Sequence, residues 1–459
     1  MYYLKIVLII SWLWLSGCVS LAPQYLRPDL QIPDTIENES IALVNGMKTK
    51  FTTPSWKAFI TDSQMQQTIQ LALNKNKDLY LAALDVEEAR LRFGISVAEK
   101  YPQIMSSIGG DYSQSLNGDS SLEKKYSTGV DISYELDFFG RIKNLSEADK
   151  ASFLASQAMS RATQIITIKT VAEAYLDVVY NQQLLLIAQD TKTNYLHSQS
   201  IVKQKVLAGQ ANISDLDQAK GQVQSIDITI EKIKSDVARN ENLVSFLTNN
   251  YSQKIGFSLS LYQPIAVPSN IPSEILLKRP DVMAAEQGIV SENANIGVAR
   301  AAFFPSISFN SSITSGNDSL SGLFDSSNGI WNFLPKITLP IFTGGKNSKN
   351  LDLAIIRKNK AIVNYEKSIQ VAFREVKDAL TMKSSLQKQL VAQENYVNTL
   401  NNILAQKQAS YRYGGLSYLN VLDAQRDLFT GKQNLLLLNI EQQKNEINLF
   451  SALGGGLIE

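Results

Sequence analysis

The stretch Tyr126-Ser-Thr-Gly-Val-Asp-Ile-Ser-Tyr-Glu-Leu-Asp-Phe138 alternates bulky and small polar side chains with a period of two. Because successive side chains of a strand point to opposite faces of its sheet, this pattern predicts a β-strand with one apolar and one polar face. Strands of roughly ten residues with such alternation are what a transmembrane barrel requires. A half-buried sheet of a soluble protein would show the same alternation, so the pattern alone does not decide between them.

Three further segments show the same alternation. Between Trp331 and Ile341, large apolar residues alternate with polar ones, and weaker alternation follows Ile104 and Ile307. Serine, asparagine, glycine and aspartate fill the intervening loops. We therefore expect four strands in two hairpins, at about 103–116 and 126–138 and at about 306–315 and 330–341.

Two long segments without proline predict long helices. None of the twelve prolines lies between Arg141 and Gln263 or after Pro340, and a proline in a helix interior costs about 3 kcal/mol. Apolar residues recur there at spacings of three and four, as in helices that pack as coiled coils. Gly209 and the Gly414-Gly415 pair interrupt the series where helical hairpins would turn.

The second half of the sequence repeats the first. Tyr101-Pro102 recurs as Phe304-Pro305, and Gly209 recurs as Gly414 at a similar offset. Near-constant offsets indicate a duplicated unit. We expect a first repeat at 57–249 and a second at 281–453, each with a helix, two strands, a long helix, a turn and a helix. The turns fall at 208–212 and 413–417, a linker spans 250–280, and a tail spans 454–459.

The N-terminus has the features of an export signal. Lys5 precedes the apolar run Ile6–Leu15, which is too short to span a bilayer. The run ends in Leu15-Ser-Gly-Cys18, which resembles a bacterial lipobox. By that resemblance, residues 1–17 are removed and Cys18 carries diacylglycerol and an N-acyl chain such as palmitate, at the start of a segment 18–56. A plain signal peptide with a chance cysteine is the alternative.

Composition excludes several function classes. The formal net charge of +1 gives no basic patch for nucleic acid, and one cysteine with one histidine cannot build a zinc site. No HExxH, P-loop or GxSxG motif occurs in the sequence. We therefore expect no enzyme, no cofactor other than the lipid, and no bound metal.

Four strands cannot close a barrel within one chain. An open sheet edge cannot face lipid, because its N–H and C=O groups would lack partners. The smallest spanning barrels have about eight strands, so the sheet must be completed by further copies of the chain. Three copies would give twelve strands, although the hydrogen-bond argument does not fix that number. The predicted helix from Ile142 to Leu207, about 66 residues, would reach roughly 100 Å.

The sequence resembles the outer membrane factors of tripartite efflux pumps, in the lipoprotein branch of the TolC/OprM-like family. The resemblance runs in family order over nearly the whole chain. It rests on Leu-Ser-Gly-Cys at 15–18, Tyr134-Glu-Leu-Asp-Phe-Phe-Gly-Arg141, Arg279-Pro-Asp-Val-Met-Ala-Ala-Glu286, Ala294–Ile307, Pro340–Gly345, Tyr418–Arg426 and Ala452–Gly456.

This resemblance implies a mainly α-helical protein with a β-barrel part, internally duplicated and assembled as a homotrimer. A twelve-stranded barrel in the outer membrane would continue into a coiled-coil α-helical barrel in the periplasm. A mixed equatorial domain would come from roughly 24–56 and 250–280. An adaptor (a membrane fusion protein) would contact the tips at Gly209, Asn212, Gly414, Gly415 and Ser417.

The resemblance also implies a periplasmic gate. Leu419 and Asp423 are four residues apart and share a helix face, so in a trimer each forms a ring that narrows the pore or favours cations. A solvated aspartate and a coiled-coil leucine are the plainer interpretation. Tyr411 and Asp215 match family gate residues and would share a hydrogen bond. Ser410 and Leu416 stand where different members have arginine, so an ionic part of the closure is absent there.

The implied function is passive export of drugs or other small toxic compounds, driven by an inner-membrane transporter of the resistance-nodulation-division (RND) type. Two alternatives remain: an exit channel for type I protein secretion, and a structural coiled-coil lipoprotein. The four alternating strands argue against the second, because a coiled-coil stalk does not use them.

Overall fold

The computed structural model of the chain describes residues 20–29, 32–37, 54–114, 122–251 and 270–456. The expected signal peptide, Cys18, and most of the linker at 250–280 lie outside the described residues. The chain divides into two compact units, which we describe separately. Unit 1 comprises Met1–Leu30, Leu84–Ala158 and Met283–Lys367, and unit 2 comprises Gln31–Ala83, Met159–Val282 and Ser368–Glu459.

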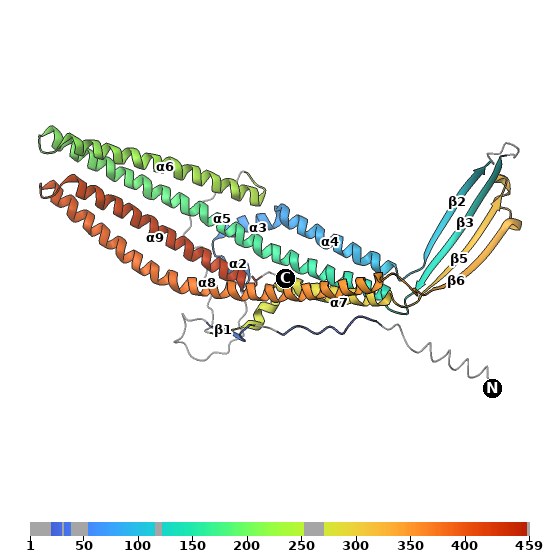
Figure 1. Cartoon of the computed structure of the whole chain (residues 1–459). Helices are drawn as coiled ribbons and strands as arrows, with labels where there is room; N and C mark the ends of the chain where they lie inside the picture. The colour runs from blue at the N-terminus through green and yellow to red at the C-terminus, as the bar shows by residue number, and fades with distance from the viewer. Residues whose placement is uncertain (1–19, 30–31, 38–53, 115–121, 252–269, 457–459) are drawn as a thin grey trace. The chain divides into compact units, whose positions relative to one another are not determined.

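Unit 1 contains a four-stranded antiparallel sheet in the order β2-β3-β5-β6 (Figure 1). The strands are β2 (Gln103–Ser113), β3 (Glu123–Leu136), β5 (Ser306–Asn317) and β6 (Gly329–Thr338). Strand β3 ends two residues before the expected Phe138. The reason is that the Asp137 carboxylate leaves the ladder and accepts hydrogen bonds from the N–H groups of Ile142 (3.0 Å) and Lys143 (2.7 Å), which start the next helix.

The strand register gathers the apolar side chains on one face of the sheet. Ile132 of β3 lies opposite Ile104 of β2, while Val130 lies opposite Ile313 of β5, which in turn lies opposite Trp331 of β6. These side chains remain exposed in the single chain; Ile104 and Trp331 are each 68% exposed. The other face contains Asp131, Glu135 and Lys336, among others. The sheet is therefore apolar on one face and polar on the other.

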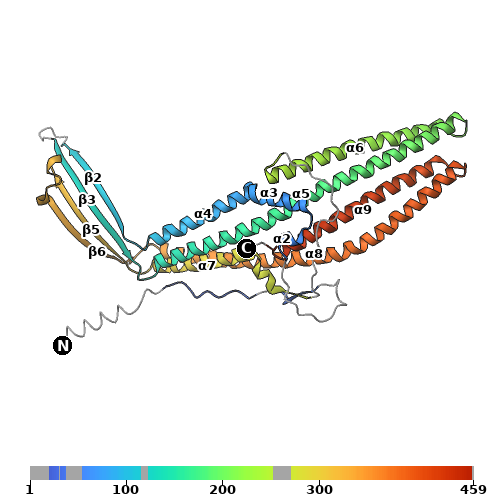
Figure 2. The same ribbon diagram turned by 180° about the vertical axis from the view of Figure 1, so that it is seen from behind.

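Four long helices form two antiparallel hairpins that lie side by side in both views (Figures 1 and 2). Helices α5 (Arg141–Leu207) and α8 (Lys346–Arg412) have 67 residues each, which corresponds to about 100 Å. They are followed by α6 (Ile213–Thr248) and α9 (Tyr418–Ala452). Apolar clusters join the two hairpins in unit 2; one combines Ala188 of α5, Ile230 of α6 and Leu436 of α9.

Shorter elements complete the described chain. They are β1 (Thr35–Glu37), α2 (Trp56–Phe59), α3 (Ser63–Lys75), α4 (Lys77–Ala98), β4 (Asn270–Pro272), α7 (Pro280–Ala301) and the 3-10 helices η2 (Ser273–Lys278), η3 (Leu320–Gly322) and η4 (Ser326–Asn328). Strand β1 pairs antiparallel with β4 in unit 2. This small sheet joins two segments that the family resemblance assigns to the equatorial domain.

In unit 2, residues from early and late in the sequence pack together. The rings of Phe59 and Phe450 stack at 4.8 Å, and the Trp56 N–H donates to the Gly456 carbonyl at 2.9 Å. A Cβ at Gly456 would lie 1.8 Å from the Pro54 carbonyl oxygen. Glycine is therefore required at position 456, where the backbone passes close to Pro54.

In unit 1, residues 20–29 are held by side-chain contacts with helices α7 and α5. The Arg27 guanidinium donates to both carboxylate oxygens of Glu286, at 2.7 and 2.8 Å. The Asn293 side-chain amide donates to the Pro23 carbonyl at 2.7 Å, and the Ser20 hydroxyl donates to Asn144 at 2.7 Å. The first described residues are thus held in place by side-chain contacts.

Among the described residues, none of the helices is long and apolar enough to cross a bilayer. The same residues contain no group of three or more His, Cys, Asp or Glu side chains that could hold a metal ion.

Gly431 allows α9 to approach α8 closely. A Cβ at this position would lie 2.8 Å from Cδ1 of the buried Leu400 and 3.5 Å from Val397. We expect Gly431→Leu to lower the free energy of unfolding by about 1–3 kcal/mol through overpacking. Thermal unfolding followed by circular dichroism in detergent measures the change.

Gly221 of α6 provides the matched control, because a Cβ there meets nothing within 4 Å. Gly221→Leu should leave the stability unchanged or raise it by up to about 1 kcal/mol, since leucine favours helix more than glycine does. Equal losses from the two substitutions would contradict close packing at Gly431.

Candidate functional site

The candidate site is the end of unit 2 where both helical hairpins turn (Figure 1). At the end of α5, the Gly209 N–H donates to Val206 at 3.0 Å and the Gln210 N–H donates to Lys205 at 2.8 Å. These two bonds form a Schellman motif, which satisfies carbonyls that the last helical turn leaves unpaired. The φ angle of Gly209 is +72°, a conformation that favours glycine.

The second hairpin turns through the same motif. At the end of α8, the Gly414 N–H donates to Tyr411 at 3.2 Å, and the Gly415 N–H donates to Ser410 at 2.9 Å. Gly414 has a φ angle of +81°. Asn212 and Ser417 then stand in extended conformation at the starts of α6 and α9. All five residues that the resemblance assigns to adaptor contact are thus exposed at these two turns.

Leu419 and Asp423 lie on one exposed face of α9, just beyond the second turn. Leu419 is 51% exposed, and the Asp423 side chain is 53% exposed. The Asp423 carboxylate lies 3.8 Å from the guanidinium of Arg426, one turn further along. Such an exposed pair contributes little to stability. The sequence interpretation overlooked Arg426, although its spacing of three from Asp423 was visible.

Tyr411 is buried and does not make the expected hydrogen bond with Asp215. Its hydroxyl is enclosed and has no hydrogen-bond partner among the described residues. Its ring instead lies 5.6 Å from that of Tyr418 and within 4.4 Å of the Lys205 ammonium. Burial, and secondarily the charge of Asp215, raises the pKa of Tyr411 above its ordinary value.

The core beneath the two turns joins all four helices. Tyr411 and Tyr418 pack with Val202 of α5, Leu216 of α6 and Val421 of α9. Burial raises the pKa of Tyr418 to about 12. About one helical turn from Val202 and Val421, on the side away from the hairpin turns, the Gln425 side-chain amide donates to the Ser198 hydroxyl at 2.8 Å. The second hairpin is therefore packed against the first. Leu419 and Asp423 follow directly after its turn, so this packing helps to fix their position.

Lys205 also joins the two hairpins, and the sequence interpretation did not identify it. Its ammonium donates to the carbonyls of Tyr411 (2.6 Å) and Arg412 (3.3 Å), the last residues of α8. The cation therefore lies at the negative end of the helix dipole, beside carbonyls that lack helical partners. A basic residue in the last turn of α5 was visible in the sequence, but its contact with another helix was not.

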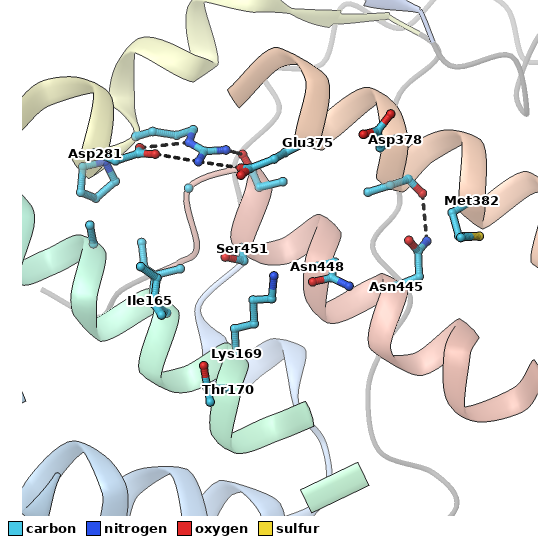
Figure 3. A pocket seen from close by; sticks show the side chains of 17 residues that line it. Ile165, Lys169, Thr170, Asp281, Glu375, Asp378, Met382, Asn445, Asn448 and Ser451 are labelled. Atoms are coloured by element: carbon cyan, nitrogen blue, oxygen red, sulfur yellow. Dashed lines mark hydrogen bonds and ion pairs between the residues drawn. The ribbon is translucent and has the colours of Figure 1, made fainter. Parts of the chain in front are cut away.

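A second feature of unit 2 is a cavity of about 540 Å³ between α5, α8 and α9, at the start of α7, lined by both polar and apolar side chains (Figure 3). Figure 3 shows Lys169 and Thr170 on one side and Asp378, Asn445 and Asn448 on the other. The Asn445 side-chain amide is already committed, because it donates to the Ala379 carbonyl at 2.9 Å. Asn445 therefore connects α9 to α8 in the wall of the cavity.

Arg279 closes one end of this cavity and holds three elements together. Its guanidinium lies 2.8 Å from carboxylate oxygens of both Asp281 and Glu375, and it donates to the Ala452 carbonyl at 2.8 Å. Its side chain is only 9% exposed. The neighbouring carboxylates outweigh burial and raise its pKa, so it remains charged. The Arg279-Pro-Asp281 sequence was noted only as part of the family resemblance, and this role was missed.

Comparisons with known proteins cover nearly the whole chain. The family described as "Outer membrane efflux protein" matches residues 68–265 and 271–455. The probable outer membrane lipoprotein SilC of Salmonella typhimurium is 42% identical over 463 residues, covering 100% of both chains. The cation efflux system protein CusC of Escherichia coli O6:H1 is 43% identical over 449 residues, covering 96% of each.

A crystal structure of CusC superposes with a TM-score of 0.88 at 41% sequence identity. The match covers 95% of the present chain and 100% of that chain.

Removing the Arg279 guanidinium should destabilise unit 2. We expect Arg279→Met to lower the free energy of unfolding by about 1–3 kcal/mol, because the Ala452 carbonyl loses its donor and the partly exposed carboxylates of Asp281 and Glu375 lose their partner. Chemical denaturation in detergent, followed by circular dichroism, measures the loss.

Arg374 of α8 is the control for this substitution. Its guanidinium lies 3.9 Å from Asp378, and both side chains are at least 70% exposed. Arg374→Met should cost less than about 1 kcal/mol. If Arg279→Met costs no more than that, the guanidinium does not join the three elements as described.

Proposed function

The chain belongs to the outer membrane efflux protein family, and we propose that three copies form the outer-membrane exit channel of a tripartite efflux pump. The channel is passive and is not an enzyme. The observation that carries the proposal is the four-stranded sheet, which has one exposed apolar face and two unpaired edges. Such a sheet satisfies its backbone groups in a bilayer only when further copies continue it into a closed barrel.

In the proposed trimer, β2 of one copy pairs with β6 of the next, which gives twelve strands. Ile104 and Trp331 then face lipid, and Glu135 and Lys336 face the interior. The helices supply a second surface for assembly. Ile228 of α6 (73% exposed) and Val391 of α8 (60% exposed) lie on the outer helices of the two hairpins, where a neighbouring copy would cover them.

The proposed lipid anchor is Cys18, carrying diacylglycerol and an N-acyl chain. Support comes from the residues just after it: Ser20 is bonded to Asn144, and Arg300 donates to the Leu21 carbonyl at 3.0 Å. Asn144 is near the start of α5, and Arg300 is near the end of α7, just before β5. These contacts would hold the acyl chains beside the base of the sheet, where lipid begins.

The proposed partners are a periplasmic adaptor and an inner-membrane transporter of the RND type. The two exposed turns offer the adaptor matched surfaces, because they repeat one backbone motif. The proposed gate is formed by Leu419 and Asp423 as rings of three, backed by Tyr411 and Asp215. The equatorial domain is proposed to include the small β1–β4 sheet.

The proposed cargo is toxic cations, because the relative CusC is described as a cation efflux system protein. The exposed carboxylate of Asp423 supports cation passage, whereas Arg426 beside it moderates the negative charge. Drugs or other small toxic compounds are the second candidate, and type I protein secretion is the third.

Planar-bilayer recording tests the channel and its gate. Purified wild-type protein should have three times the mass of one chain and carry small currents that favour cations. Leu419→Ala should increase the conductance by removing bulk, and Asp423→Ala should reduce the preference for cations by removing charge. Glu231→Ala removes an exposed carboxylate from α6, on the other hairpin and away from the second turn, and should change neither. The absence of current from correctly inserted protein would refute the channel.

Growth assays in the native host test the cargo. Deleting the gene should increase sensitivity to toxic metal cations, and the wild-type gene should restore resistance. If only drug sensitivity changes, the cation assignment is wrong and the second candidate replaces it. If an exported protein accumulates in the cells with both sensitivities unchanged, the channel serves protein secretion.

A further inference from the structure

We propose that Lys205 is a positioning residue for the closed gate, which holds the α8–α9 turn against the first hairpin through its ammonium group. This inference rests on the proposed gating function. The juxtaposition is specific: one ammonium contacts two backbone carbonyls and the face of Tyr411. It connects the last turn of α5 to the last turn of α8, so it joins the two hairpins beside their turns.

The Lys205 ammonium brings a positive charge and hydrogen-bond donors to the C-terminal end of α8. The last carbonyls of a helix lack helical donors and carry partial negative charge, so a cation there is favourable. The Tyr411 carbonyl already accepts the Gly414 N–H at 3.2 Å, and Lys205 adds a second donor at 2.6 Å. Lys205 therefore strengthens the same carbonyl on which the turn depends.

The ring of Tyr411 adds a second interaction with Lys205. The ring is buried and contacts both the Lys205 ammonium and the ring of Tyr418. Its hydroxyl has no hydrogen-bond partner in the described chain. A cation over an aromatic face is attracted to the ring itself. The ring is thus held through its face and its backbone, and the phenol-to-carboxylate bond is not needed for this.

The duplication shows that the contact is one-sided. Gly209 corresponds to Gly414, so Lys205 corresponds to Ser410 in the second repeat. Serine has no charge and a short side chain, and it cannot return the contact. A cation near Ser410 is therefore supplied by the other hairpin of the same chain, through Lys205.

Tyr411 and Tyr418 link the Lys205 contact to the proposed pore-lining residues of α9. Tyr418 begins α9 and packs on Tyr411, and Leu419 and Asp423 follow on the exposed side of that helix. Nearer the middle of the helices, the Ser198–Gln425 bond fixes α9 to α5. The Ser198–Gln425 bond thus joins the two hairpins at some distance from their turns. Nearer the turns, the Lys205 ammonium joins the end of α8 to the first hairpin.

The test combines hydrogen exchange with conductance. Lys205→Met keeps a chain of similar length and removes the charge; Lys205→Arg keeps the charge; Lys203→Met removes an exposed charge two residues earlier. We expect Lys205→Met to accelerate exchange of the Gly414 and Gly415 amides several-fold. The Gly209 and Gln210 amides of the other turn, whose acceptors lie within α5, should stay unchanged. Lys205→Met should also raise the conductance several-fold, and the other two variants should resemble wild type.

Each outcome has a defined meaning. Faster exchange at Gly414 together with higher conductance supports the proposal. Unchanged exchange refutes it whatever the current, and faster exchange with wild-type current refutes the gating role. Asp423→Ala is recorded beside these variants. If it alters ion preference while Lys205→Met changes nothing, only the present inference fails; if wild type carries no current, the proposed function fails.

Discussion

The structure depends above all on the need of every backbone N–H and C=O group for a partner. A four-stranded sheet with an exposed apolar face leaves two edges unpaired, and neither edge can be placed in lipid. No rearrangement within one chain solves this, because the remaining described residues are already committed to helices, turns and one small sheet. The same requirement shapes the helix ends, where Schellman turns and Lys205 satisfy carbonyls that the helices leave open.

Local patterns predicted the regular elements well. The alternation around Val130 predicted β3, because neighbouring residues decide which side chains share a face of a strand. Gly209 and Gly414 predicted the two turns, since a positive φ angle favours glycine. The end of β3 was misplaced because the Asp137 side chain competes with the ladder for backbone groups, and a period of two does not reveal such competition.

Contacts between distant segments were not predictable in the same way. Arg279 joins Glu375 and Ala452, and Lys205 joins Tyr411, only because particular helices become neighbours in the folded chain. The expected bond between Tyr411 and Asp215 came from family resemblance and does not form, since the ring is held from its face. The exposed residues Leu419 and Asp423 lie on a common face, as spacing alone could predict.

The hydrogen bond between Trp56 and Gly456 has a consequence for biogenesis. It joins two residues that lie far apart in the sequence, and Phe59 stacks on Phe450 in the same region. Contacts of such long range form late, because closing a long loop costs entropy before any contact repays it. Unit 2 therefore cannot reach its final packing while the chain is still emerging from the translocation machinery. The Trp56–Gly456 bond and the Phe59–Phe450 contact therefore form only after the last helix, α9, has arrived.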